Sequence, residues 1–271
     1  MDEYIKATQK LQPDIVVGLG DVPFGAETIS RKKVDKITDR TARWMQEQVT
    51  RQVQDVKDDT VTGTLPALFA PLLPLHVETQ KWYLDRVIET LVDRISGLAV
   101  YKDFSLLDLP IELQALPRLG FTEPNSPRKL LAEIAQGIDI ATIPFIGAAT
   151  DAGIALDFSF PIKSSLNDIS TPQPLGVDMW QTSHATDVSP LQADCECYTC
   201  TKHHRAYLQH LLMAKEMLGW VLLQIHNHHI LDRFFAGVRE SIANDGFEQD
   251  TSAFLRMYEP ELPEKTGQGP R

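Results

Sequence analysis

Three cysteines, Cys195, Cys197 and Cys200, lie within six residues of one another, and they are all the cysteines of the chain. Thiolates spaced C-x-C-x₂-C can supply three ligands to one Zn²⁺ ion from a single tight loop, and a tetrahedral ion then needs a fourth ligand from elsewhere. Three free or buried thiols are the alternative, but the clustering favours a metal. The fold must therefore bring a distant segment back to this loop.

Candidate fourth ligands follow the cysteines. Residues 201–225 contain no proline and one glycine, and their apolar positions recur at helical spacing, which predicts one amphipathic helix with His226 at its far end. These positions are Tyr207, Leu211, Ala214, Leu218, Leu222 and Ile225. Three ligands from a loop plus one distant histidine are typical of a closed structural zinc site. The residue types alone leave other nearby histidines open as alternatives to His226. They are His203, His204, His228 and His229.

Composition indicates an ordinary globular protein. The 271 residues suffice for one large or two modest domains, and 43% of them are hydrophobic and 23% charged. No run approaches the ~18 apolar residues that a membrane span needs. Residues 1–20 lack the basic start and apolar centre of a signal peptide. We therefore expect a reducing, intracellular setting in which the thiols stay available for a metal.

The charge distribution is uneven. A formal net charge of −11 argues against a protein whose whole surface binds nucleic acid. Residues 31–43 differ, because six basic residues there face only Asp35 and Asp39, a net of +4. A solvated helix face and a phosphate-binding patch both fit such a segment. Its basic residues are Arg31, Lys32, Lys33, Lys36, Arg40 and Arg43.

Strand-like and helix-like segments alternate over the first ~145 residues, which predicts βα units on a parallel sheet. The expected strands lie at 14–19, 72–77, 95–101, 116–121 and 138–145. We expect helices at 2–11, at 79–92, and from the N-cap Ser126 to 136–137. A further, long helix lies between the first two of these, carries an apolar stripe and ends in the polar turn 57–63. The stripe comprises Val34, Ile37, Thr41, Trp44, Gln48 and Val49.

About five strands can be counted, whereas a closed (β/α)₈ barrel of the TIM type needs eight. We therefore expect an α/β fold with a partial barrel of this type and a C-terminal zinc-binding subdomain. The first helix, 2–11, would normally cover a preceding strand. The predicted division is a partial barrel at 1–162, an insertion and connection at 163–194, a zinc-binding helical segment at 195–259, and a disordered tail rich in proline, glycine and charge at 260–271.

Residues 195–227 contain CECYTC, RAYLQHLL and EMLGWVLLQIHN. These motifs resemble the zinc-binding segment of the tRNA-guanine transglycosylases. The family pattern runs C-x-C-x₂-C, then R-A-Y-(L/I)-x-H-L, then an H-N pair whose histidine is the fourth ligand. The interval from Cys200 to His226 also matches, so the resemblance implies a site made of Cys195, Cys197, Cys200 and His226.

Shorter similarities extend the resemblance over most of the chain. DVSPL at 187–191 resembles the family's D-x-x-P-L, and SGLAV at 96–100 resembles its G-G-L-A turn. PRLGF at 117–121 and GID at 137–139 stand where the family has P-R-Y-L-x-G and G-(I/V)-D-M-F-D strands. PDIVVGLGD at 13–21 resembles a P-D-x-x-x-x-F-D-E strand. The resemblance implies that the strands missing from the count of eight are the first barrel strands of the family.

The departures from the family pattern concern catalysis. The last Asp of G-(I/V)-D-M-F-D is the nucleophile of the catalytic members, and Thr142 occupies that position here. A threonine hydroxyl without an activating base is a poor nucleophile near neutral pH. The base-recognising Gln-Gly turn is not visible near 75–79, Ser96 replaces one glycine of G-G-L-A, and only Asp21 has a counterpart in the polar base-recognition set.

A chain that lacks the nucleophile but keeps the zinc-binding segment resembles the non-catalytic accessory members of this family. The resemblance implies a chain without enzymatic activity that forms a heterodimer with a catalytic queuine tRNA-ribosyltransferase subunit. That partner exchanges guanine for queuine at the wobble position of certain tRNAs, so tRNA would be bound through the complex. The resemblance also implies a cytoplasmic protein that can associate peripherally with the mitochondrial outer membrane.

Two other functions fit the sequence. One is an active transglycosylase that uses Asp139, Asp151 or Asp157 in place of the missing carboxylate. Asp139 lies three residues from Thr142, so in a strand its side chain points to the opposite face, ~10 Å away along the strand. The other is a zinc-stabilised protein-interaction module without a tRNA role.

Overall fold

The computed structural model describes residues 1–25, 29–57, 65–162, 171–264 and 266–267. Residues 58–63 of the predicted polar turn, residues 163–170 at the start of the predicted insertion, and residues 265 and 268–271 of the predicted tail lie outside these ranges. The chain forms two compact units, one of Met1–Glu123 with Ala132–Thr142 and one of Pro124–Leu131 with Ile143–Arg271. In the described part of the chain, no helix has both the length and the apolar character to cross a membrane.

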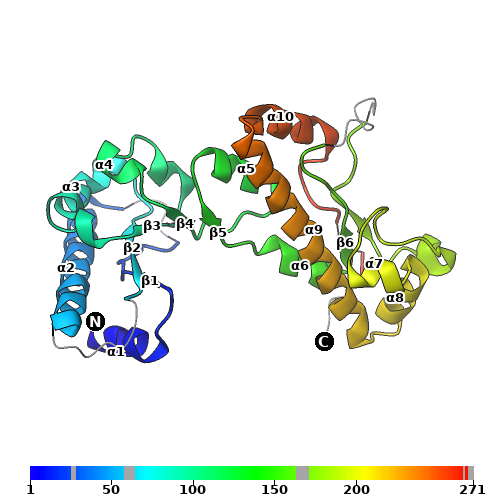
Figure 1. Ribbon diagram of the computed structural model, residues 1–271, viewed down its shortest axis with the longest axis horizontal. Helices are drawn as coiled ribbons and strands as arrows, with labels where there is room; N and C mark the ends of the chain where they lie inside the picture. The colour runs from blue at the N-terminus through cyan, green and yellow to red at the C-terminus, as the bar shows by residue number, and fades with distance from the viewer. Residues whose placement is uncertain (26–28, 58–64, 163–170, 265, 268–271) are drawn as a thin grey trace. The chain divides into compact units, whose positions relative to one another are not determined.

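The first unit contains a five-stranded parallel sheet in the order β1-β2-β3-β4-β5 (Figure 1). Spatial order follows chain order, as in a (β/α)₈ barrel, and the register pairs Val16 with Leu68, Ala70 with Leu98, and Gly120 with Ala141. The expectation of a partial barrel is confirmed. The strands are β1 (Ile15–Val17), β2 (Ala67–Leu72), β3 (Gly97–Val100), β4 (Arg118–Gly120) and β5 (Ile140–Ala141).

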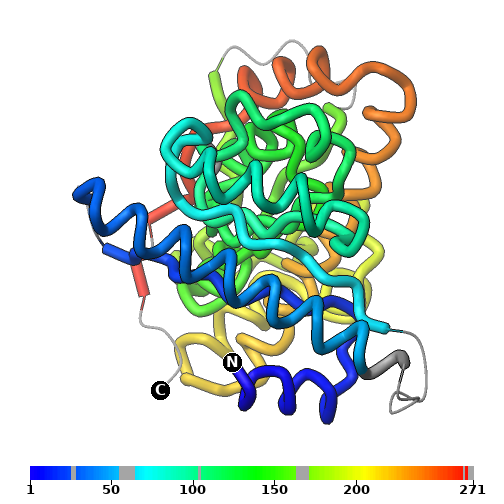
Figure 2. The backbone as a smooth tube through the Cα atoms, turned by 90° about the vertical axis from the view of Figure 1, so that its left-hand side faces the viewer, coloured from blue at the N-terminus to red at the C-terminus, as the bar shows by residue number. Residues whose placement is uncertain are grey.

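Helices connect these strands, and α2 and α3 lie side by side (Figure 2). The predicted stripe of α2 is buried except for the half-buried Trp44. The sheet and these helices share one core, which includes Val16, Met45, Leu72 and Leu98. The elements are α1 (Asp2–Leu11), α2 (Arg31–Lys57), α3 (Lys81–Thr90), α4 (Ile111–Gln114), α5 (Pro127–Ala135), and the 3₁₀ turns η1 (Val77–Gln80), η2 (Val92–Arg94) and η3 (Asp103–Leu106).

The prediction of a strand at 72–77 is wrong, because β2 ends where that segment begins. The buried Gln80 side chain holds the following residues in a turn. Its Nε2 donates to the carbonyls of Leu73 (2.9 Å) and Leu75 (2.7 Å), and its Oε1 accepts from Leu73 N (3.1 Å). The predicted strand at 138–145 is shorter than expected, since β5 ends at Ala141 and Phe145 already begins a helix.

The second unit pairs two antiparallel strands with a set of helices (Figure 1). Its core joins α8 and α9 to the strands through Leu208, Leu212, Leu223 and Ala155. In addition, the aromatic rings of Phe158, Phe234 and Phe254 pack against one another, with ring centroids 5.6–6.1 Å apart. The elements are α6 (Phe145–Ala152), β6 (Ile154–Leu156), β7 (Gly176–Asp178), η5 (Thr182–Thr186), α7 (Tyr198–Lys202), α8 (Arg205–Met213), α9 (Met217–Ala243) and α10 (Phe247–Met257).

The prediction of one helix from 201 to 225 is wrong, because three helices, α7, α8 and α9, occupy this region. The chain turns between α8 and α9 at Lys215, which has a φ of 57°. His226 consequently lies within α9 instead of at a helix end. The expected apolar face is also divided, since Leu222 is buried while Leu218 and Ile225 are 45% and 39% exposed.

Candidate metal centre

The three cysteines lie at the start of α7. Cys197 is the N-cap of this helix, and its Sγ accepts a hydrogen bond from Cys200 N at 3.3 Å. The Thr199 hydroxyl donates to Leu222 O at 2.7 Å, which ties the short helix to α9. A loop that caps its own helix with a thiol therefore presents the cysteines toward α9.

The four predicted side chains converge. One ligand atom from each of Cys195, Cys197, Cys200 and His226 lies within 4.8 Å of all the others. The distances from His226 Nδ1 to the Sγ atoms are 3.7, 3.6 and 3.4 Å, in chain order. Bonds of ~2.3 Å to sulfur and ~2.05 Å to nitrogen at a tetrahedral angle place S and N about 3.6 Å apart. The observed spacing thus fits a tetrahedral metal ion with these four ligands.

His226 is held in the orientation that a metal ligand requires. Its side chain is fully buried, and Nε2 lies 2.9 Å from Leu156 O of β6. A carbonyl oxygen can only accept, so this contact assigns the proton to Nε2 and leaves the Nδ1 lone pair facing the sulfur atoms. Such a second contact fixes the tautomer and ring plane of metal-bound histidines.

Asn227 is a second buried polar residue of α9, and the residue types around it do not by themselves predict its role. Its Oδ1 accepts from Leu156 N at 2.8 Å, and its Nδ2 donates to Ile154 O and Thr150 Oγ1, both at 3.0 Å. His226 and Asn227 together therefore bind the main chain of β6. The H-N pair of the motif was the available signal, because a buried amide needs several partners.

The electrostatics of the cluster favour a cation at its centre. Burial opposes the charged form of His226, but the three cysteines raise its pKa to about 11. Burial also raises the pKa of Cys195. The pKa of Cys197 would rise through burial, yet hydrogen bonds from the His226 side chain and the Cys200 N–H lower it to about 6. These contacts need a second proton on His226, at Nδ1, which supplies the central positive charge of the metal-free cluster; a metal ion would replace that proton.

The four alternative histidines lie outside the cluster. His204 Nδ1 accepts from Tyr207 N at 3.2 Å and caps α8, and the His203 ring stacks on Tyr207 at 5.0 Å. His228 is exposed and His229 half-buried on α9. Of the histidines in the described ranges, His226 is the one that joins the three cysteines.

Thr142 lies immediately after β5, at the carboxyl end of the sheet. Its hydroxyl donates to Gly120 O at 3.0 Å, and its N–H donates to the same carbonyl at 3.2 Å. Asp139 lies at the other end of β4, where its Oδ2 accepts from Arg118 N at 2.9 Å. Because Arg118 and Gly120 are the first and last residues of β4, Asp139 cannot take the place of Thr142.

The remaining carboxylates have other surroundings. Asp157 Oδ1 accepts from Gln192 Nε2 at 2.9 Å, and Asp151 is exposed; both belong to the second unit. Asp21 forms an ion pair with Arg40 at 2.9 Å. The structure therefore places no carboxylate hydrogen-bonded to Thr142 among the residues that it describes.

A partial parallel β/α barrel followed by a helical unit with a Cys₃His cluster defines an α/β protein with a candidate structural metal site. The family model described as queuine tRNA-ribosyltransferase matches residues 1–260. The chain belongs to this family.

Three relatives are named queuine tRNA-ribosyltransferase accessory subunit 2. The chain is 38% identical over 275 residues to that of Schizosaccharomyces pombe, with 100% of the chain and 59% of the relative covered. It is 31% identical to that of Drosophila pseudoobscura pseudoobscura (94% and 61% covered) and 29% identical to that of Anopheles gambiae (98% and 64%). The chain thus spans less than two thirds of the length of each of these relatives.

Proposed function

We propose that the chain is a non-catalytic accessory subunit of queuine tRNA-ribosyltransferase. It would support a catalytic partner that exchanges guanine for queuine at the wobble position of tRNA. The observation that carries the proposal is Thr142, whose hydroxyl hydrogen-bonds to Gly120 O at the position of the family's nucleophile. Threonine needs an adjacent base to become nucleophilic, and the described residues offer it a main-chain carbonyl instead. The names of the relatives support the same role.

We propose Zn²⁺ as the metal of the Cys₃His cluster. Three thiolates and one imidazole are borderline-soft ligands that suit zinc in tetrahedral geometry, and the four side chains together would fill all four positions around the ion. The ion would stabilise the fold, because the site joins the cysteine loop to α9 and, through Leu156, to β6. Metal analysis of the purified protein tests this assignment.

The proposed partner is a catalytic homologue, and α9 offers a surface for it. Met217, Leu218, Val221 and Ile225 lie on one side of the first turns of α9, and all four are between 39% and 64% exposed. Contiguous apolar side chains on a surface favour a protein contact over solvent. Because this surface ends directly before His226, the metal would hold the partner-binding side of α9 in place.

The test is a base-exchange assay with labelled guanine and substrate tRNA. We expect no incorporation and no covalent tRNA adduct with the chain alone, and incorporation when a catalytic subunit is added. Turnover by the isolated chain that is abolished by Asp139→Asn would establish an active transglycosylase instead. If the two chains elute separately and the catalytic subunit is equally active alone, the zinc-stabilised interaction module becomes the better description.

For location, we propose the cytoplasm, where a reducing environment keeps thiols available for metal. Peripheral association with the mitochondrial outer membrane rests on the family resemblance alone. Fractionation of cells that express a tagged chain tests both statements.

A further inference from the structure

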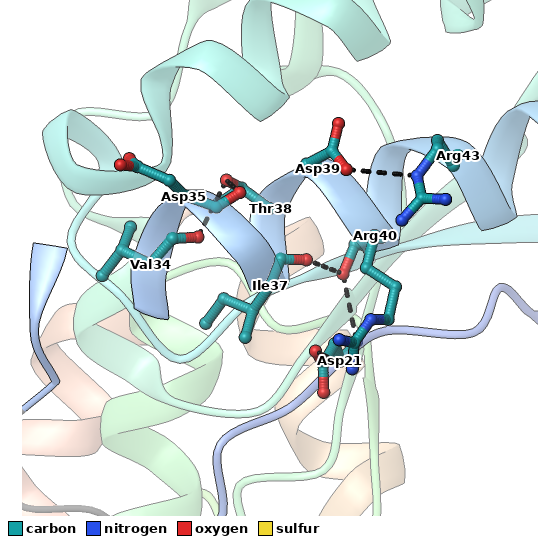
Figure 3. Close-up of polar contacts among 9 residues, drawn as sticks. Asp21, Val34, Asp35, Ile37, Thr38, Asp39, Arg40 and Arg43 are labelled. Atoms are coloured by element: carbon teal, nitrogen blue, oxygen red, sulfur yellow. Dashed lines mark hydrogen bonds and ion pairs between the residues drawn. The ribbon is translucent and has the colours of Figure 1, made fainter. Parts of the chain in front are cut away.

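The first two turns of α2 carry four exposed cationic side chains, Arg31, Lys32, Lys33 and Lys36, called the α2 cluster below. Among the described residues, no carboxylate forms an ion pair with any of the four. The rest of the same helix differs (Figure 3): Arg40 pairs with Asp21 at 2.9 Å, and Arg43 pairs with Asp39 at 3.1 Å. Carboxylates therefore neutralise Arg40 and Arg43 farther along α2, whereas the four cations of the α2 cluster form no ion pair with a described carboxylate.

This placement of charge is unfavourable for the isolated chain. Like charges on neighbouring turns repel each other, and cations near a helix N-terminus oppose the helix dipole. The first turn of α2 contains no acidic residue, although the chain as a whole has a net charge of −11. An anion bound at the α2 cluster would remove this repulsion.

The α2 cluster also has a defined position on the sheet. Helix α2 follows β1 in a parallel βα unit, so its first turns lie toward the carboxyl ends of the strands. Val34 and Ile29 line a cavity of about 720 Å³ there, together with His76, Tyr101 and Lys102 from the segments after β2 and β3. This is the edge at which (β/α)₈ proteins bind their ligands, and the cavity lining there includes a cation, Lys102, and an aromatic ring, Tyr101.

We propose that Arg31, Lys32, Lys33 and Lys36 contact the phosphate backbone of an RNA, which on the proposed function is the tRNA brought by the catalytic partner. Lysine ammonium groups bind phosphates as mobile point charges, and each contact releases counterions from the nucleic acid. Lys32 and Lys36 lie one turn apart on one side of α2, so both can follow one strand.

Two other anionic partners fit the structure less well. A membrane-surface helix inserts an apolar face, but the apolar residues of α2 in this region, Val34 and Ile37, are buried in the protein core. An acidic protein surface is a weaker candidate because lysine is depleted in the cores of protein–protein interfaces.

The experiment compares the triple variant Lys32→Gln/Lys33→Gln/Lys36→Gln with the full wild-type chain. Binding of substrate tRNA is measured by fluorescence anisotropy between about 50 and 200 mM salt. Both the complex with the catalytic subunit and the chain alone are titrated, so the result stands even if no complex forms. The matched control, Lys6→Gln/Lys10→Gln/Arg94→Gln, removes the same charge from exposed positions elsewhere in the first unit.

We expect the triple variant to bind tRNA with a salt dependence that is shallower by about 2 in log K against log salt, since each lost single-strand phosphate contact contributes about 0.7. The control and the charge-preserving Lys→Arg triple should keep the wild-type slope. Circular dichroism verifies that the variants are folded.

An unchanged slope and affinity in a folded Gln triple would overturn the proposal, whether or not the catalytic subunit co-elutes. Loss of the complex with unchanged RNA binding would assign the α2 cluster to an acidic protein surface. Loss of binding to phosphatidylserine vesicles with unchanged RNA binding would assign it to a membrane. Either result also overturns the proposal.

Discussion

Replacing Asn227 with leucine should destabilise the second unit and loosen the metal site. The substitution keeps side-chain size but removes the bonds to Leu156 N and Ile154 O, which lie at 2.8 and 3.0 Å. Both groups are in buried residues of β6. An unsatisfied buried backbone group costs about 1–3 kcal/mol, so the two together predict a loss of ~2–6 kcal/mol. Thr150 adds little, because its hydroxyl still donates to Ile146 O.

The metal site should respond as well, since Leu156 O also fixes the His226 ring. Disturbing such a supporting contact typically lowers metal affinity by about 10- to 100-fold. We therefore expect faster metal transfer from Asn227→Leu to a chelator, in addition to a lower unfolding midpoint.

The assay is urea unfolding followed by tryptophan fluorescence. Trp180 and Trp220 lie 6.2 Å apart in the second unit, and Trp44→Phe with Trp82→Phe would remove the signal of the first unit. Asn244→Leu at the exposed C-cap of α9 is the control and should stay within about 0.5 kcal/mol of wild type. If Asn227→Leu has the same urea unfolding midpoint as Asn244→Leu and keeps its metal, the Asn227 side chain does not stabilise β6.

Two further substitutions test the site and its helix. His226→Ala should lose metal and have a lower melting temperature. His228→Ala, at an exposed position one residue beyond Asn227, should change neither property. Full metal occupancy in His226→Ala would refute the ligand assignment. Gly237→Ala should destabilise by at least about 1–3 kcal/mol in urea unfolding, because the added Cβ would lie 1.8 Å from Phe160 O. Gly147→Ala on α6, where a Cβ meets nothing within 4 Å, should instead stabilise by about 0.5–1 kcal/mol, and equal effects of the two would contradict this reasoning.

Alternation of apolar runs with helical patterns predicts the parallel sheet because each run is bounded by polar or turn residues. The bounds of α1 were predicted as observed. Strand β2 was misplaced because residues 67–75 form one nearly continuous apolar run, ALFAPLLPL. The hydrogen bonds from the Gln80 side chain to Leu73 and Leu75 mark where β2 stops, and hydrophobic periodicity does not report such contacts.

The Cys₃His cluster could be predicted from ligand types and spacing, but the path of the chain around it could not. Residues 214–216 are Ala, Lys and Glu, which are good helix formers, so no local signal separates α8 from α9. The turn is instead made by bonds from Glu216 N to Leu211 O and from Lys215 N to Leu212 O. Tertiary packing of α9 against β6 overrides local propensity here.

The attachment of His226 and Asn227 to β6 sets an order of events during synthesis. β6 and the cysteine loop leave the ribosome first, while the histidine that completes the ligand set and the amide that satisfies β6 emerge together, 26 and 27 residues after Cys200. Neither the strand nor the thiol loop can reach its final state until that one helical turn arrives. Metal loading would therefore coincide with the docking of β6 in one late step, and a chain interrupted within the first turns of α9 would leave both the thiols and β6 without their partners.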